Sequence, residues 1–172
     1  YGRFDLAFNA ALKNWLAPSD TAPPGGHTPV FRFYNDRTGA HFYTNSVAER
    51  DFVIARLPEF GYEGPRFQAA NQPAEGLSPV FRFYNARTGA HFYTISAAER
   101  DFVIDRLPEF KYEGPTWYAQ TQPGNNASAM HRFYNTQRGA HFYTIIQGEV
   151  DFVRGNLPMY RYEGIAYYAW TN

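Results

Sequence analysis

The chain has 172 residues, which is long enough for a single domain with a sizeable core. Its 16 lysines and arginines balance its 16 acidic residues, so it lacks the basic excess that nucleic-acid binding needs. It has no cysteine, which excludes disulfides, thiol catalysis and cysteine-bound zinc, and no apolar run long enough to cross a membrane.

Residues 1–28 differ in composition from the rest of the chain. Within residues 3–16 the large apolar side chains fall on one helical face, namely Phe4, Phe8, Leu12 and Trp15. This spacing predicts an amphipathic helix, and the following SDTAPPGG predicts a linker. The helix is either the tail of an upstream domain or a surface that docks on a protein partner. The chain begins at Tyr1 rather than Met, so we expect it to be a processed or trimmed part of a longer protein.

Residues 29–172 contain one pattern three times, with a period of about 50 residues. The copies occupy residues 29–78, 79–128 and 129–172. Over the 36 positions that begin at Pro29 and Pro79, the first two copies differ at only five. The third copy keeps the spacing but has diverged, with Ile146 in place of serine and Val150 in place of arginine.

Each copy reads as a β-hairpin, a short helix and a returning strand. PVFRFYN and AHFYT are rich in aromatic and β-branched residues, and the NDRTG between them predicts a tight turn in which Gly39 takes a positive φ. Ser46 followed by Glu49 is a capping box, and Phe52, Val53 and Leu57 have helical spacing. The Leu-Pro step ends the helix, and GYEGPRFQA returns as one longer strand or two short ones.

The three copies predict an all-β fold with short helices. One copy cannot bury both of its faces, and open stacks of repeats need polar capping units at each end. We expect no such cap after the third copy, because its pattern runs to Trp170. We therefore predict a closed ring, a β-trefoil-like pseudo-threefold barrel of three repeats. Another compact threefold arrangement of hairpins and helices is the alternative.

The strings FRFYN, TGAHFYT, AERDFV and YEG resemble a repeat family of exported bacterial and some fungal proteins, whose activity is not established. The resemblance covers nearly all of residues 29–170. It implies a β-trefoil, often attached to hydrolases or surface proteins, and a tendency to bind glycans. It also implies a secreted or cell-surface location. Any site that uses positions 146 or 150 is altered in the third copy.

His41, His91 and His141 occupy equivalent positions, so three interpretations are open. A threefold axis could gather three imidazoles around zinc, but a position just after a hairpin turn usually lies at a rim. We favour a structural role, in which one ring nitrogen donates to a backbone carbonyl and the ring packs on a neighbouring aromatic. A ligand contact, once in each copy, is the other possibility.

The carboxylates favour structure over catalysis. The capping box accounts for Glu49 and Glu99, whereas Glu149 loses its capping partner. We expect the aspartates at 51, 101 and 151 to pair with the arginines at 32, 82 and 132. Three equivalent copies are a poor basis for one asymmetric active site, and no nucleophile, zinc-protease or phosphate-loop motif occurs. We therefore expect neither an enzyme nor a cofactor.

The remaining hypothesis is binding. Glycan sites combine an aromatic face with polar side chains that bind hydroxyls. Every copy offers four candidates: Asn35, His41, Tyr43 and Glu63; Asn85, His91, Tyr93 and Glu113; Asn135, His141, Tyr143 and Glu163. We predict a multivalent, lectin-like, non-catalytic module whose ligands are glycans or cell-surface polysaccharide. A structural subunit of an extracellular assembly and a metal-binding accessory domain are the alternatives.

Overall fold

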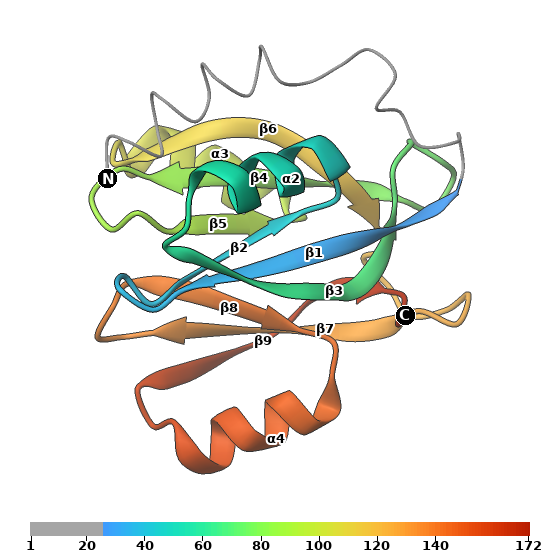
Figure 1. Ribbon diagram of the computed structural model, residues 1–172. Coiled ribbons are helices and arrows are strands. Elements are labelled where there is room, and N and C mark those ends of the chain that lie inside the picture. Colours follow the sequence, from blue (N-terminus) through green and yellow to red (C-terminus); the bar gives the residue numbers. More distant parts are fainter. Residues whose placement is uncertain (1–25) are drawn as a thin grey trace.

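The computed structural model describes residues 26–172, which form three units that each contain two strands, a helix and a third strand (Figure 1). Unit 1 consists of β1 (His27–Asn35), β2 (Ala40–Thr44), α2 (Val47–Arg56) and β3 (Phe60–Ala70). Unit 2 consists of β4 (Ser78–Asn85), β5 (His91–Thr94), α3 (Ala97–Arg106) and β6 (Phe110–Ala119). Unit 3 consists of β7 (Ser128–Asn135), β8 (Ala140–Thr144), α4 (Gln147–Asn156) and β9 (Tyr160–Ala169). The amphipathic helix and the partner surface expected near the N-terminus lie outside the described residues.

The first two strands of each unit form the predicted hairpin. In unit 1, β1 and β2 are antiparallel, with Asn35 opposite Ala40 at the turn. The Asn35 side chain holds this turn, because its Oδ1 accepts a hydrogen bond from the backbone N–H of Arg37 at 3.0 Å. Gly39 has φ of +75°, as the turn chemistry requires. The third strand, β3, runs antiparallel along the other edge of β1 and is one long strand.

The three helices in the described part of the chain begin and end where the sequence pattern predicts. Ser46 caps α2 by accepting a hydrogen bond from the Glu49 N–H at 3.1 Å, and Ser96 caps α3 in the same way. Ile146, which precedes α4, makes no side-chain capping bond, as its apolar side chain requires. The structure also contains no helix, within residues 26–172, that is long and apolar enough to cross a membrane.

The nine strands of residues 26–172 form two antiparallel sheets, and the closed barrel expected from the sequence is wrong. Units 1 and 2 share a six-stranded sheet in the order β2-β1-β3-β6-β4-β5, while unit 3 forms a separate sheet in the order β8-β7-β9. The first strand of every unit pairs on both sides within its own unit, so little backbone pairing remains to join the units. Short contacts join them: Ala70 with Tyr118, Gln68 with Trp170, and Gln120 with Tyr168.

Side chains of a shared core hold the units together. Tyr43, Tyr93 and Tyr143 lie on β2, β5 and β8 and form a closed cycle of hydrogen bonds. Each hydroxyl accepts a hydrogen bond from the backbone N–H of a second tyrosine and donates to that tyrosine's carbonyl, with all six distances between 2.7 and 2.9 Å. The three rings meet edge to face at 5.4–5.7 Å. Every unit therefore depends on both of the others.

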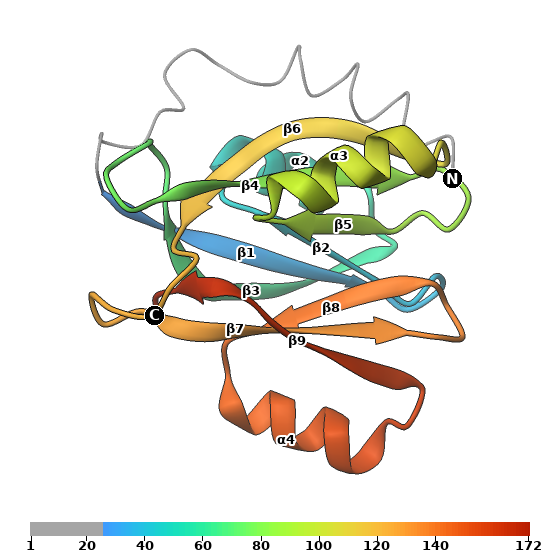
Figure 2. The ribbon, with the colours of Figure 1, turned by 180° about the vertical axis from the view of Figure 1, so that it is seen from behind.

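The helices lie on the outside of this core. Figures 1 and 2 place α4 at one end of the molecule, below the sheet of unit 3, and α2 and α3 toward the other end. Each helix packs an apolar face on its own hairpin, as Val53 of α2 does in a cluster with Phe33 and Phe42. Each helix also borders the neighbouring unit, and the two clefts described next form at the borders of α4 with unit 1 and of α3 with unit 3.

Candidate functional site

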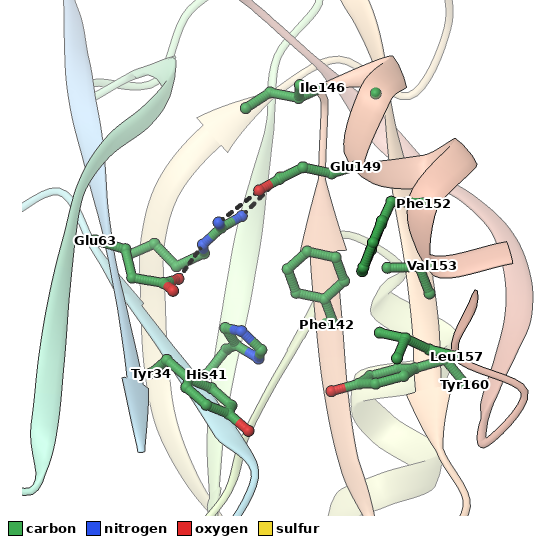
Figure 3. Close-up of a pocket in the computed structure, with 12 residues that line it drawn as sticks. Tyr34, His41, Glu63, Phe142, Ile146, Glu149, Phe152, Val153, Leu157 and Tyr160 are labelled. Atoms are coloured by element: carbon green, nitrogen blue, oxygen red, sulfur yellow. Dashed lines mark hydrogen bonds and ion pairs between the residues drawn. The ribbon is translucent and has the colours of Figure 1, made fainter. Parts of the chain in front are cut away.

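A cleft of about 480 Å³ lies between unit 1 and unit 3, and we call it cleft A (Figure 3). One wall comes from unit 1 and is polar, with Arg32, Tyr34, His41 and Glu63. The opposite wall comes from β8, α4 and β9 and is largely apolar: Phe142, Ile146, Phe152, Val153, Leu157 and Tyr160. Figure 3 shows Phe152 and Tyr160 on the side opposite Tyr34 and Glu63, with the hydroxyl end of Tyr160 directed toward Tyr34.

An arginine fixes the polar wall of cleft A and also joins the two units. The Arg32 guanidinium donates two parallel hydrogen bonds to Glu149 of α4, at 2.9 and 2.7 Å, and one from Nε to Glu63 at 2.6 Å. It also lies 5.1 Å above the Phe142 ring. This bidentate geometry satisfies the buried cation and holds both carboxylates in fixed orientations. Because only one oxygen of Glu63 is used by Arg32, the other can accept a hydrogen bond from a ligand.

A second cleft of about 460 Å³, cleft B, lies between unit 2 and unit 3 and has the same plan. Arg132 donates to Glu99 of α3 at 2.8 and 3.2 Å and to Glu163 at 2.9 Å. His141 lies beside Glu163, with Nε2 and Oε1 3.1 Å apart. The apolar wall contains Phe102 of α3, and the mouth also includes Asn85, Arg87 and Arg161.

Burial and neighbouring charges shift the pKa values of several groups in the two clefts. Burial, with the positive charge of Arg32, lowers the pKa of His41 to about 3, so its ring is neutral. Burial also lowers the pKa of His141. Burial would by itself raise the pKa of Glu163, but its hydrogen bond with His141 and the charge of Arg132 lower that pKa to about 2. The pKa of Glu149 is lowered as well, because the hydrogen bond from Arg32 outweighs burial.

Of the residues proposed from the sequence as ligand contacts, some line the clefts and others are buried. His41 and Glu63 line cleft A, and His141 and Glu163 line cleft B. Their equivalents His91 and Glu113 lie at the border of units 1 and 2, where both side chains are buried. The pKa of Glu113 is about 2, because the charge of Arg82 outweighs the opposing effect of burial.

The asparagines and tyrosines of that proposal serve the fold. The side chains of Asn35, Asn85 and Asn135 each hold a hairpin turn, although Asn85 also borders cleft B. The tyrosines Tyr43, Tyr93 and Tyr143 are fully buried in the hydrogen-bond cycle, so no ligand reaches them in this structure.

The histidines are neither at a rim nor gathered around a metal. Each ring packs on a phenylalanine of another unit, as His41 does on Phe142 at 4.7 Å, His91 on Phe42 at 4.8 Å and His141 on Phe92 at 4.8 Å. Within residues 26–172, no group of three or more histidines and carboxylates is placed to hold a metal ion.

The expected pairing of arginines with aspartates is also wrong. Asp51 pairs with its neighbour Arg50 on the exposed side of α2, whereas Arg32 takes Glu63 and Glu149. Glu149 and Asp151 are two residues apart, which is about 200° around the helix, so only the glutamate faces the next unit. Glu149, expected to lose its partner with the capping serine, instead binds Arg32 and the Thr144 hydroxyl.

Sequence reasoning did not identify the apolar walls or the partnership between units. The missed residues include Phe102 and Phe152, whose side chains are 57% and 58% exposed although they are large and apolar. A signal was present in the third copy, which retains Glu149 although its capping serine has become Ile146. A glutamate that persists without its capping partner has another role, and that role is the bond to Arg32.

Comparison with known proteins gives one result. Neither a curated protein nor a solved structure matches the chain. The model of a family described as a domain of unknown function (DUF5648) matches residues 29–170, which is most of the chain and all three units. The protein therefore belongs to the DUF5648 family.

Proposed function

We propose that the chain is a non-catalytic carbohydrate-binding module of a secreted or cell-surface protein. The observation that carries this proposal is the pair of clefts between units, in which an exposed phenylalanine faces a fixed set of polar groups. Phe152 and Tyr160 supply the ring wall of cleft A, and Glu63 and Tyr34 supply hydroxyl-binding groups opposite.

This combination suits a sugar ring. A pyranose has an apolar face of C–H groups and a rim of hydroxyls, so it gains from stacking on an aromatic ring while carboxylates accept its hydroxyl protons. A volume of about 480 Å³ is in the range of small-ligand pockets and accommodates one or two sugar rings. Two clefts on one rigid body raise the avidity for a polysaccharide without any new contact.

The protonation states support binding rather than hydrolysis. Glycoside hydrolysis needs a carboxylic acid that stays protonated near neutral pH, which requires a raised pKa. Three glutamates that bind the arginines have the opposite shift: the pKa of Glu163 is about 2, and those of Glu149 and Glu99 are lowered. Their ionised side chains accept hydrogen bonds but have no proton to donate.

We also propose that the three units are related by a trefoil-like pseudo-threefold axis. The tyrosine cycle supports this relation, because each unit contacts both others in the same way. The arginine pairs support it too: Arg32, Arg82 and Arg132 each bind one glutamate of their own unit and one from the helix of a neighbouring unit.

Saccharide arrays followed by calorimetry test the proposed function. Wild-type protein is expected to bind a saccharide, and the double variant Phe102→Ala/Phe152→Ala to lose most of that affinity. The control is Ile54→Ala, which removes an equally exposed apolar side chain that lines neither cleft. Absence of any saccharide binding at millimolar concentration, or equal binding by the double variant, would contradict the proposal.

A further inference from the structure

A second cavity, of about 570 Å³, adjoins cleft A on the side of unit 1. We call it the extension. Cleft A and the extension share two residues, Tyr34 and Glu63, which line both of them. The extension also contains the ring of Tyr62, which is 42% exposed, together with the exposed side chains of Asp36 and Arg37. The extension thus repeats the combination of an aromatic ring and polar groups that cleft A presents.

Gly61 lies at the junction of the two cavities. It is directly opposite Tyr34 in the pairing of β1 with β3, and it lines the extension. Opposed residues of two strands have their side chains on the same face, so a side chain at position 61 would lie next to the Tyr34 ring. A methyl group there would meet the Tyr34 carbonyl oxygen at 3.5 Å, an ordinary contact distance, so the backbone does not require glycine. Units 2 and 3 have Lys111 and Arg161 at this position.

Unit 3 shows the effect of a long side chain at the same position. Arg161 is directly opposite Tyr134 in the pairing of β7 with β9. Its guanidinium lies 5.3 Å above the Tyr134 ring, and its Nη2 is 3.5 Å from Oε2 of Glu163. The Glu163 side chain is 18% exposed, whereas that of Glu63 is 30% exposed. The arginine therefore occupies in cleft B the place that is open in cleft A.

We propose that cleft A and the extension form one groove that binds a linear polysaccharide along its length, with the chain passing over Tyr34 and Glu63. The inference rests on the proposed function for the class of ligand. Cleft A alone accommodates one or two sugar rings, so a chain that also enters the extension brings further rings into contact. At the junction Tyr34 offers a stacking surface and Glu63 an acceptor for hydroxyls. Cleft B, where Arg161 covers the junction, binds only short saccharides.

Hydroxyl-radical footprinting of the free protein tests the junction without any ligand. Tyr34 and Tyr134 lie in the tryptic peptides FYNDR and FYNTQR, in which the phenylalanine is fully buried, so oxidation of each peptide reports on its tyrosine. Tyr34 is expected to be oxidised faster than Tyr134. Gly61→Arg is expected to lower the oxidation of Tyr34 to the level of Tyr134. Arg161→Gly makes the reciprocal change and is expected to raise the oxidation of Tyr134.

The control for these variants is Ile54→Arg. It adds the same charge to unit 1 at an exposed position of α2, where unit 3 already has Arg154, and it lines neither cleft A nor the extension. It is expected to leave the oxidation of Tyr34 unchanged. If Gly61→Arg does not fold, Arg161→Gly still tests the junction. The inference is overturned if neither tyrosine responds to the exchange of the residue opposite it.

Calorimetry with linear oligosaccharides of cellulose, chitin, xylan and starch, from the monosaccharide to the hexasaccharide, tests the ligand. The affinity of wild-type protein is expected to rise roughly 2- to 13-fold beyond the disaccharide, which is the effect of about one aromatic stacking contact. This gain is expected to disappear in Gly61→Arg and to remain in Ile54→Arg.

The results separate this inference from the proposed function. Saccharide binding without any gain beyond the disaccharide overturns the inference and leaves the proposed function standing. The same holds if the gain persists in Gly61→Arg, or if only branched or single sugars bind. Absence of saccharide binding, both in these series and on the arrays, overturns the proposed function and the inference together, whatever the footprints show.

Discussion

Replacing Tyr93 with phenylalanine removes one hydroxyl from the tyrosine cycle and tests what holds the three units together. That hydroxyl accepts a hydrogen bond from the Tyr43 N–H at 2.8 Å and donates one to the Tyr43 carbonyl at 2.7 Å. The substitution leaves both buried backbone groups of Tyr43 without this partner. Each such group costs about 1–3 kcal/mol, so the free energy of unfolding is expected to fall by roughly 2–6 kcal/mol. The ring itself remains, so no cavity larger than one oxygen forms.

Urea denaturation measures this loss. The free energy of unfolding, extrapolated linearly to water, is compared between Tyr93→Phe and wild-type protein. The control is Tyr62→Phe, which removes a hydroxyl from a side chain that is 42% exposed and is expected to change stability by less than about 0.5 kcal/mol. Because the cycle is closed, Tyr143→Phe should cost about as much as Tyr93→Phe. A loss below about 1 kcal/mol at either position would refute the reasoning, since it would mean that the backbone groups find other partners.

Acid is expected to destabilise the fold, because the pKa of His41 falls from 6.5 to about 3 on burial and an unfolded chain therefore binds a proton that the folded one does not. This contribution to stability is intact above pH 6.5 and is lost as the pH falls toward 3, by up to about 1.4 kcal/mol per pH unit. The urea midpoints of wild-type protein and His41→Gln should therefore converge as the pH is lowered. Midpoints that fall in parallel would contradict this prediction. Glu49→Gln removes the negative charge that pairs with the buried Arg82, so the free energy of unfolding is expected to fall by about 3–5 kcal/mol. Glu99→Gln, at the more exposed pair with Arg132, should cost about 1 kcal/mol or less, and equal losses would show that burial does not set the difference.

The elements within each unit could be predicted from the sequence because their signals are local. The turn before Gly39, the cap at Ser46 and the end of α2 at Leu57 all depend on residues a few positions apart. The contacts between units could not be predicted, because they join residues that are far apart in the chain. Tyr43 meets partners that lie fifty and a hundred residues along the chain, and no local pattern distinguishes a buried hydroxyl in a cycle from one on a surface.

The site was predicted in part for the same reason. Alternation along β2 places His41 and Tyr43 on one face of the strand, but it does not tell which neighbour covers that face. His41 lines cleft A, whereas Tyr43, two residues further, lies in the core. The exposure of the apolar wall of cleft A depends on the distance between α4 and unit 1, which tertiary packing sets.

The tyrosine cycle also limits how this kind of protein can grow. In a solenoid each added repeat finds a free face at the end of the stack, so arrays lengthen by one unit at a time. Here the hydroxyls of Tyr43, Tyr93 and Tyr143 leave no free end, because each one already serves the backbone of another unit. The tyrosine of a fourth copy would find no free backbone N–H and carbonyl for its hydroxyl, and no free tyrosine hydroxyl for its own backbone. We therefore expect such domains to multiply as whole sets of three units joined by linkers, rather than by the addition of single copies.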